Sequence, residues 1–184
     1  MRIRHVALGI GLLVVPHLAW GQDATVVLSG HAFALQLPPH FARVNADTAA
    51  MDAMYLAPLR SDGTQGRILV QLIDMTAMPD SARPTLDAWA SQMLSEQRQQ
   101  DGWQEQDSDV QIDGVPARQI QWSEPAGRFP DRPQDVRRLC GTMILGFKGN
   151  MAFALHALDG QPHSDTTLAI DDRALRTFRL IRRQ

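Results

Sequence analysis

Two apolar segments in the C-terminal part of the chain constrain its fold more than any other feature. Residues 140–147 read CGTMILGF, and residues 151–158 read MAFALHAL. Successive side chains of a strand point to opposite faces of the sheet, and both segments are apolar at odd and even positions alike. They therefore predict two strands buried on both faces and joined by the tight turn KGN. Each face needs a cover, and helices are the obvious candidates.

A β-hairpin is predicted just before these strands, in QIDGVPARQIQW at residues 111–122. Apolar residues alternate on both sides of Asp113-Gly114, a pair that favours the positive φ angles of a two-residue turn. Pro116 suits the start of the returning strand, because it has no amide hydrogen to donate. We interpret this stretch as a turn and not as a functional site.

Further strands are predicted within residues 31–37, 50–58 and 67–74. A helix should follow, because apolar residues recur there at the spacing of one helical face, with Thr85 as N-cap and Gly102 as C-cap. These residues are Leu86, Trp89, Ala90, Met93 and Leu94. A final helix, capped by Ser164, has an apolar side that Asp171 adjoins. That side comprises Ile170, Ala174, Leu175 and Phe178.

This order of elements predicts an α+β fold, an antiparallel sheet with a helix on each face. A β-sandwich is the alternative, and the helix predicted from Leu86 to Leu94 disfavours it.

The N-terminus has the parts of a cleaved signal peptide. Arg2 and Arg4 precede a short apolar run at residues 6–15, and Ala19 and Gly21 fit cleavage before Gln22. We expect residues 1–21 to direct export to the periplasm and to be the only part that meets a membrane. Residues 22–184 are expected to form one domain.

Cleavage would change the net charge from −2 to −4. This balance argues against nucleic acid as a partner, because nucleic-acid binding needs a basic surface. Cys140 is the one cysteine, so no internal disulfide can form, and we expect it to be a buried, inert thiol.

The order of several segments resembles the PsbP-like family, and within it the bacterial DcrB-type exported proteins. These segments are FALQLPPHF, TLDAWASQML, IDGVPARQIQW, GTMILGFKGNMAFALHALDG and RALRTFRL. The resemblance implies an α/β/α sandwich over about residues 30–181. It also implies a role in binding other proteins without catalysis. It transfers no functional residue, because the matching motifs are structural.

The sequence lacks the common catalytic motifs, and we expect neither an enzyme nor a cofactor. His156, on a predicted central strand, is expected to be a packed and hydrogen-bonded core residue. His163 could be exposed and could bind zinc together with Asp159 or Asp165. Four carboxylates within residues 101–109 are expected to lie at a solvated helix end that leads into the hairpin. The C-terminal arginines are expected on a solvated helix face and tail.

The segment EPAGRFPDRPQD, residues 124–135, is long for a connection between two strands. Arg128, Phe129 and Arg132 are its candidate partner-binding residues, because interfaces favour aromatic and arginine side chains. Phe129 could instead fold back and cover the sheet edge.

The leading hypothesis is therefore a non-enzymatic periplasmic protein-binding module, an envelope accessory or immunity-type protein with an unidentified protein partner. The alternative is a periplasmic small-molecule or metal-binding protein that uses an open face of the sheet and His156 or His163.

Overall fold

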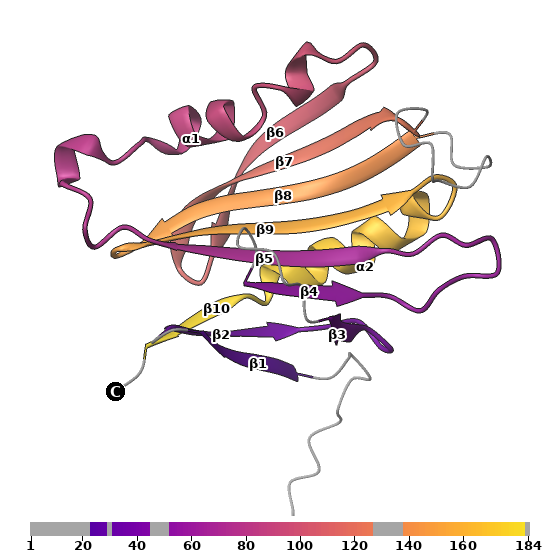
Figure 1. The fold of residues 1–184 in the computed structure, drawn as a ribbon, viewed down its shortest axis with the longest axis horizontal. Helices are drawn as coiled ribbons and strands as arrows, with labels where there is room; N and C mark the ends of the chain where they lie inside the picture. The colour runs from indigo at the N-terminus through magenta and orange to yellow at the C-terminus, as the bar shows by residue number, and fades with distance from the viewer. Residues whose placement is uncertain (1–22, 29–30, 45–51, 127–137, 183–184) are drawn as a thin grey trace, which may run out of the picture.

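The computed structural model describes residues 23–28, 31–44, 52–126 and 138–182, and it is built around two antiparallel sheets (Figure 1). The larger sheet has the strand order β3-β4-β5-β9-β8-β7-β6. Its strands are β3 (Ala42–Val44), β4 (Ala53–Leu56), β5 (Arg67–Asp74), β6 (Gln104–Ile112), β7 (Val115–Pro125), β8 (Arg138–Lys148) and β9 (Met151–Gly160). The smaller sheet has the order β1-β2-β10, from β1 (Asp23–Leu28), β2 (His31–Gln36) and β10 (Arg179–Arg182).

Two α-helices lie on opposite faces of the larger sheet, α1 (Leu86–Met93) and α2 (Ser164–Arg176). Short 3₁₀ turns, η1 (Asp80–Ala82) and η2 (Gln97–Gln99), flank α1. Within β8, Met143 and Leu145 pack in the cluster below α1, whereas Ile144 packs in the cluster below α2. Residues from β2 complete the second cluster. The predicted double cover of β8 and β9 is confirmed, and so is the α/β/α sandwich.

The Asp113-Gly114 turn is confirmed as the two-residue connection of the β6–β7 hairpin. Ile112 faces Val115, and the φ angles of Asp113 and Gly114 are 52° and 77°. The Asp113 carboxylate also accepts a hydrogen bond from the backbone N–H of Leu180, at 2.8 Å, and one from Lys148. This turn therefore fastens the start of β10 as well as closing the hairpin.

Helix α1 begins as predicted but ends earlier. Thr85 is its N-cap, and its Oγ accepts a hydrogen bond from the backbone N–H of Ala88 at 3.2 Å. The prediction of Gly102 as C-cap is wrong, because α1 ends at Met93 and a 3₁₀ turn intervenes. Gly102 has a φ of 78° in the turn before β6, where a Cβ would lie only 2.8 Å from Pro125 Cγ. The four carboxylates within residues 101–109 were expected at a solvated helix end that leads into the hairpin. Asp101 lies in the turn before β6, and Glu105, Asp107 and Asp109 lie in β6, the first strand of that hairpin.

The C-terminal helix α2 begins and ends at other residues than predicted. Ser164 is the first residue of α2 and not its cap, since His163 occupies the N-cap position without a side-chain cap bond. Phe178 lies beyond the helix and is fully buried, with its ring centroid 5.1 Å from that of Phe153. The expected arginine tail is wrong in part, because Arg179–Arg182 form β10 beside β2.

Two predictions lie outside the described residues. The expected signal peptide, residues 1–21, is one of them, and the candidate binding residues Arg128, Phe129 and Arg132 are the other. In the described part of the chain, neither helix has the length and apolar content needed to cross a bilayer.

A glycine in β8 gives a test of the core beneath α2. A Cβ at Gly146 would lie 2.2 Å from Phe153 Cζ on the neighbouring strand. We expect Gly146→Ala to lower the free energy of unfolding by about 1–3 kcal/mol, the usual range for overpacking. Urea denaturation would measure this change. Adding Phe153→Leu should recover part of the loss, and a Gly146→Ala variant as stable as the wild type would contradict the packing.

Candidate functional site

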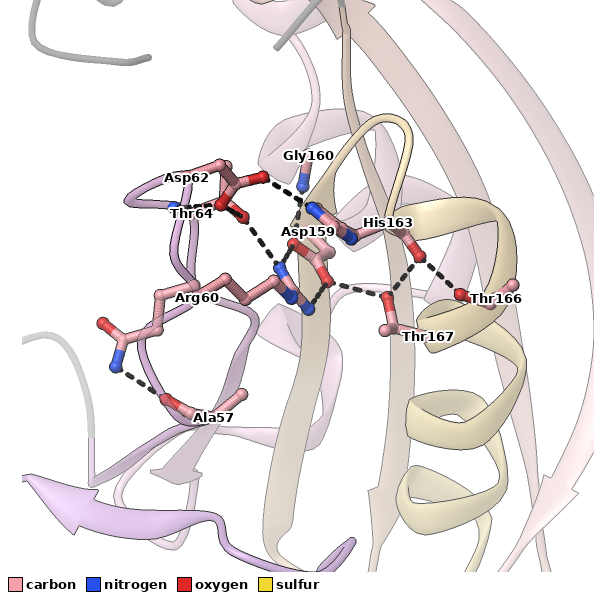
Figure 2. A network of polar contacts seen from close by, with 10 residues as sticks. Ala57, Arg60, Asp62, Thr64, Asp159, Gly160, His163, Thr166 and Thr167 are labelled. Atoms are coloured by element: carbon pink, nitrogen blue, oxygen red, sulfur yellow. Dashed lines mark hydrogen bonds and ion pairs between the residues drawn. The ribbon is translucent and has the colours of Figure 1, made fainter. Parts of the chain in front are cut away.

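A network of charged and hydroxyl side chains joins three parts of the chain at one end of the larger sheet (Figure 2). Asp159 comes from the end of β9, and His163 and Thr167 come from the start of α2. Arg60 and Asp62 come from the connection between β4 and β5. Charged side chains from three separate segments converge in this network, so it is the first candidate for a site.

Asp159 is the centre of the network and is 1% exposed. Arg60 binds it with two parallel hydrogen bonds, Nη1 to Oδ1 at 2.9 Å and Nη2 to Oδ2 at 2.6 Å. The backbone N–H of Gly160 donates to Oδ1 at 2.8 Å. The hydroxyl of Thr167 lies 2.7 Å from Oδ2. A bidentate arginine is the geometry that best compensates a buried carboxylate, so Asp159 is satisfied by the protein itself.

The outer part of the network links the β4–β5 connection to α2. Asp62 accepts from the Thr64 hydroxyl at 2.7 Å and from the Thr64 backbone N–H at 2.9 Å. His163 Nε2 lies 2.6 Å from the other oxygen of Asp62. The hydrogen bonds from Thr64, and then that with His163, lower the pKa of Asp62 below its ordinary value. Asp62 therefore stays ionised and ties His163 to this loop.

Asp171 is the exception in this region, because its charge is not compensated in the same way. It is 2% exposed on the sheet-facing side of α2, and its Oδ2 has no hydrogen-bond partner among the described residues. Burial, together with the negative charge of Asp159, raises the pKa of Asp171 to about 7, although Arg60 acts against this rise. Asp171 is therefore a carboxyl group that the fold holds near its midpoint of ionisation at neutral pH.

The geometry favours a structural role for the network. Asp159 already accepts four donors, and Arg60 occupies the position that a cation would take. In the described residues, no group of three or more His, Cys, Asp or Glu side chains is arranged to hold a metal ion. The network joins a loop, a strand and a helix, and its expected effect is to fix α2 on the sheet.

The structure separates the two histidines that the sequence singled out. His156 lies in the middle of β9 on the α1 side, opposite Leu69 and Met143. It is half-buried, and burial lowers its pKa to about 4, so it is neutral at pH 7. The expected hydrogen bond to its ring is wrong for the described residues, none of which bonds to it. The ring of His163 pairs with Asp62. Its backbone carbonyl accepts a hydrogen bond from the hydroxyl of Thr167, which also contacts Asp159.

Cys140 is half-buried and not fully buried as expected. Burial raises the pKa of its thiol, which therefore stays protonated at neutral pH. A protonated thiol is a poor nucleophile, in line with the expected inertness.

Sequence reasoning missed three members of this region, Arg60, Asp62 and Asp171, as functional or network residues. Arg60 and Asp62 lie in a loop far from β9 in the sequence, and no local pattern pairs them with Asp159 or His163. Asp171 did carry a signal, because a carboxylate beside the apolar side of a predicted helix is unusual. The candidates Arg128, Phe129 and Arg132 lie outside the described residues, so the structure does not relate them to this network.

Comparison with solved structures identifies the fold. The chain resembles the solution structure of cyanobacterial PsbP (CyanoP) from Synechocystis sp. PCC 6803, with a TM-score of 0.57 and 11% identity over 96% of this chain and 98% of that one. It resembles the Ran-binding protein Mog1p of Saccharomyces cerevisiae with a TM-score of 0.54 and 16% identity, over 86% and 95% of the two chains. LpqN, involved in cell envelope biogenesis of Mycobacterium tuberculosis, gives 0.52 and 14%, over 86% and 90%.

These similarities show a PsbP-like fold, as the sequence resemblance implied. No family model matches the chain, and no curated protein sequence matches it either. The narrower resemblance to DcrB-type proteins stays a prediction. At 11–16% identity the comparisons carry the fold and no residue role.

The Arg60–Asp159 pair can be tested by removing one partner and then both. Arg60→Met leaves Asp159 buried without its counter-charge, and we expect a loss of about 3–5 kcal/mol in the free energy of unfolding. Adding Asp159→Asn should restore part of this loss, because the uncompensated charge is then gone. Urea denaturation of both single variants and the double variant would measure the coupling. Strictly additive effects would contradict a direct ion pair.

The raised pKa of Asp171 predicts that the stability of the folded chain depends on pH. Its pKa is raised in the folded chain, so the stability it contributes is present below about pH 4 and is lost as the pH rises to about 7. We expect Asp171→Asn to gain stability over the wild type across this range, by on the order of 3 kcal/mol at pH 8. Unfolding curves from pH 4 to pH 8 would measure the difference. Asp172→Asn, on the same helix, controls for removal of one negative charge, and an equal gain there would contradict the assignment to Asp171.

Proposed function

We propose that this chain is an exported, non-enzymatic module that binds another protein in the cell envelope, as an accessory or immunity-type protein. Export rests on the signal-peptide pattern of residues 1–21. Protein binding rests on a surface of the larger sheet that the described helices leave uncovered.

This surface lies on the same side of the sheet as α1, which packs chiefly on β7 and β8 (Figure 1). Beyond α1, the strands β4, β5 and β9 point a group of partly exposed apolar side chains to that side, which we name the open sheet face. Its residues are Met54, Leu56, Leu69, Ile73 and Leu158. In the pairing register Met54 lies opposite Leu69, while Arg67 lies between Leu56 and Leu158. Gln71 separates Leu69 from Ile73 along β5. Partly exposed apolar side chains grouped on an uncovered sheet face are typical of an interaction site.

The similar solved structures support a protein-binding role only by analogy. One of them is a Ran-binding protein and another is involved in cell envelope biogenesis. Both statements concern those proteins. Protein binding through the open sheet face agrees with this analogy, because such binding needs no catalytic residues.

A second candidate, small-molecule binding, has one supporting observation. A mostly apolar groove of about 180 Å³ lies between the end of β2 and α2. Its lining residues are Gln36, Leu37, Pro38, Ile170, Arg173, Ala174 and Thr177. The groove lies on the α2 side of the molecule, away from His156 and from the open sheet face.

Two isoleucines give a matched test of the proposed function. Ile73, on the open sheet face, and Ile170, in the groove, are both 36% exposed. We expect one protein to co-purify stoichiometrically with the tagged chain from envelope extract. Ile73→Asp should lower the amount of this protein at least tenfold, whereas Ile170→Asp should retain it. Mass spectrometry of the eluate would identify the partner, and the mass of the captured chain would report cleavage after residue 21.

The opposite pattern would favour the second candidate. A small molecule in the native mass spectrum that Ile170→Asp alone removes, with no co-purifying protein, would overturn protein binding.

A further inference from the structure

The end strand β6 offers an open backbone edge. β6 pairs with β7 along all nine residues, and it is the last strand of the larger sheet. Among the described residues, no backbone hydrogen bond other than those with β7 reaches it. Its first six residues are all exposed, although the side chain of Glu105 is only 23% exposed. A long, exposed end strand is a template on which another extended chain can pair.

The hairpin turn determines which backbone groups face outward. In a two-residue hairpin the residues that flank the turn, here Ile112 and Val115, form a hydrogen-bonded pair. Hydrogen-bonded and non-hydrogen-bonded pairs then alternate along the ladder. Every second residue from Gln111 back to Glu105 therefore points its N–H and C=O away from β7. The outward set is Glu105, Asp107, Asp109 and Gln111.

The same edge is acidic on the face toward α1. Glu105, Asp107 and Asp109 alternate with neutral residues and lie opposite Trp122, Ile120 and Arg118 of β7. Asp87 of α1 adds a fourth carboxylate, 2.8 Å from Arg118. The side chains of Asp109 and Asp87 are 90% and 77% exposed.

Two guanidinium groups are the counter-charges that these carboxylates bind. Arg98 binds Glu105 at 2.7 Å, and Arg118 reaches Asp87, Asp107 and Asp109. Four carboxylates against two arginines leave this edge with a net negative charge of two. Arg118 is shared among three carboxylates, so further positive charge would be stabilised there.

This charge pattern decides the kind of strand that can pair. A second copy of β6 would place carboxylates near carboxylates, and like charges opposite one another destabilise a strand pair. A strand with lysine or arginine at alternate positions would place cations beside Glu105, Asp107 and Asp109. The carboxylates thus protect the edge from self-association and leave it open to a basic partner.

We propose that the β6 edge binds an extended basic segment of a partner protein, which adds to the larger sheet as a further strand. The proposal rests on the proposed function only in its premise of protein binding, because the edge and the open sheet face are different surfaces. Backbone hydrogen bonds to residues 105, 107, 109 and 111 provide the register, and the carboxylates select the charge.

The test uses a capped nine-residue peptide of alternating lysine and threonine, with a glutamate and threonine peptide as control. Hydrogen exchange followed by NMR would report the outward amides of the purified protein. We expect the lysine peptide to slow exchange at residues 105, 107, 109 and 111 by at least tenfold and the glutamate peptide to have no effect. Absence of this protection, or equal protection by both peptides, would overturn the proposal.

A pair of substitutions separates backbone pairing from charge. Asp107→Asn and Asp107→Pro both remove the carboxylate, and only the proline also removes an outward N–H that β7 does not use. We expect affinity for the lysine peptide to fall about threefold in the first variant and more than tenfold in the second. Equal affinities would exclude strand addition. Ile73→Asp should bind the peptide as the wild type does, so failure at the open sheet face is distinguishable from failure here.

Discussion

Burial of β8 and β9 on both faces is the constraint on which the other elements depend. These strands are apolar at every position from Met143 to Leu145 and from Met151 to Leu155, so the sheet cannot leave either side open at its centre. Helix α1 covers one side through Trp89 and Ala90, and α2 with β2 covers the other. Toward the edges of the larger sheet, at β4 and β6, the cover by the helices ends and surface becomes accessible. The surfaces proposed for binding lie at these margins because the centre has none to offer.

Polar groups under α2 show how the same burial limits chemistry. Asp159 is neutralised by Arg60 in a bidentate pair, and each of its oxygens has a further donor. Asp171 lacks such compensation, and its pKa is raised accordingly. The expected effect of the saturated network is to stabilise the position of α2, and the raised pKa of Asp171 is expected to make the stability of this region depend on pH. It does not offer an open position to a ligand in the described residues.

Local patterns predicted the central fold well, because its determinants are local. Continuous apolar runs predicted β8 and β9, and the Asp113-Gly114 pair predicted the hairpin. The strands β1, β3 and β10 escaped prediction. β3 and β10 have only three and four residues, and β10 forms against β2, which is far away in the sequence. Gly102 misled for a related reason: its positive φ was inferred correctly, but a turn before a strand needs that conformation as much as a helix end does. The Arg60–Asp159 pair joins residues 99 positions apart, and no spacing rule reaches so far.

The smaller sheet has a consequence for the order in which the molecule can assemble. β2 pairs on one side with β1, its neighbour in sequence, and on the other with β10 from the far end of the described chain. Phe33 of β2 and Phe178 before β10 meet in the core beneath α2, with ring centroids 5.8 Å apart. That core cannot form completely until residues 178–182 are available to pack against β2. If the chain crosses a membrane N-terminus first, this core would stay incomplete until nearly all of the chain had crossed. The part still to cross would then remain easy to translocate.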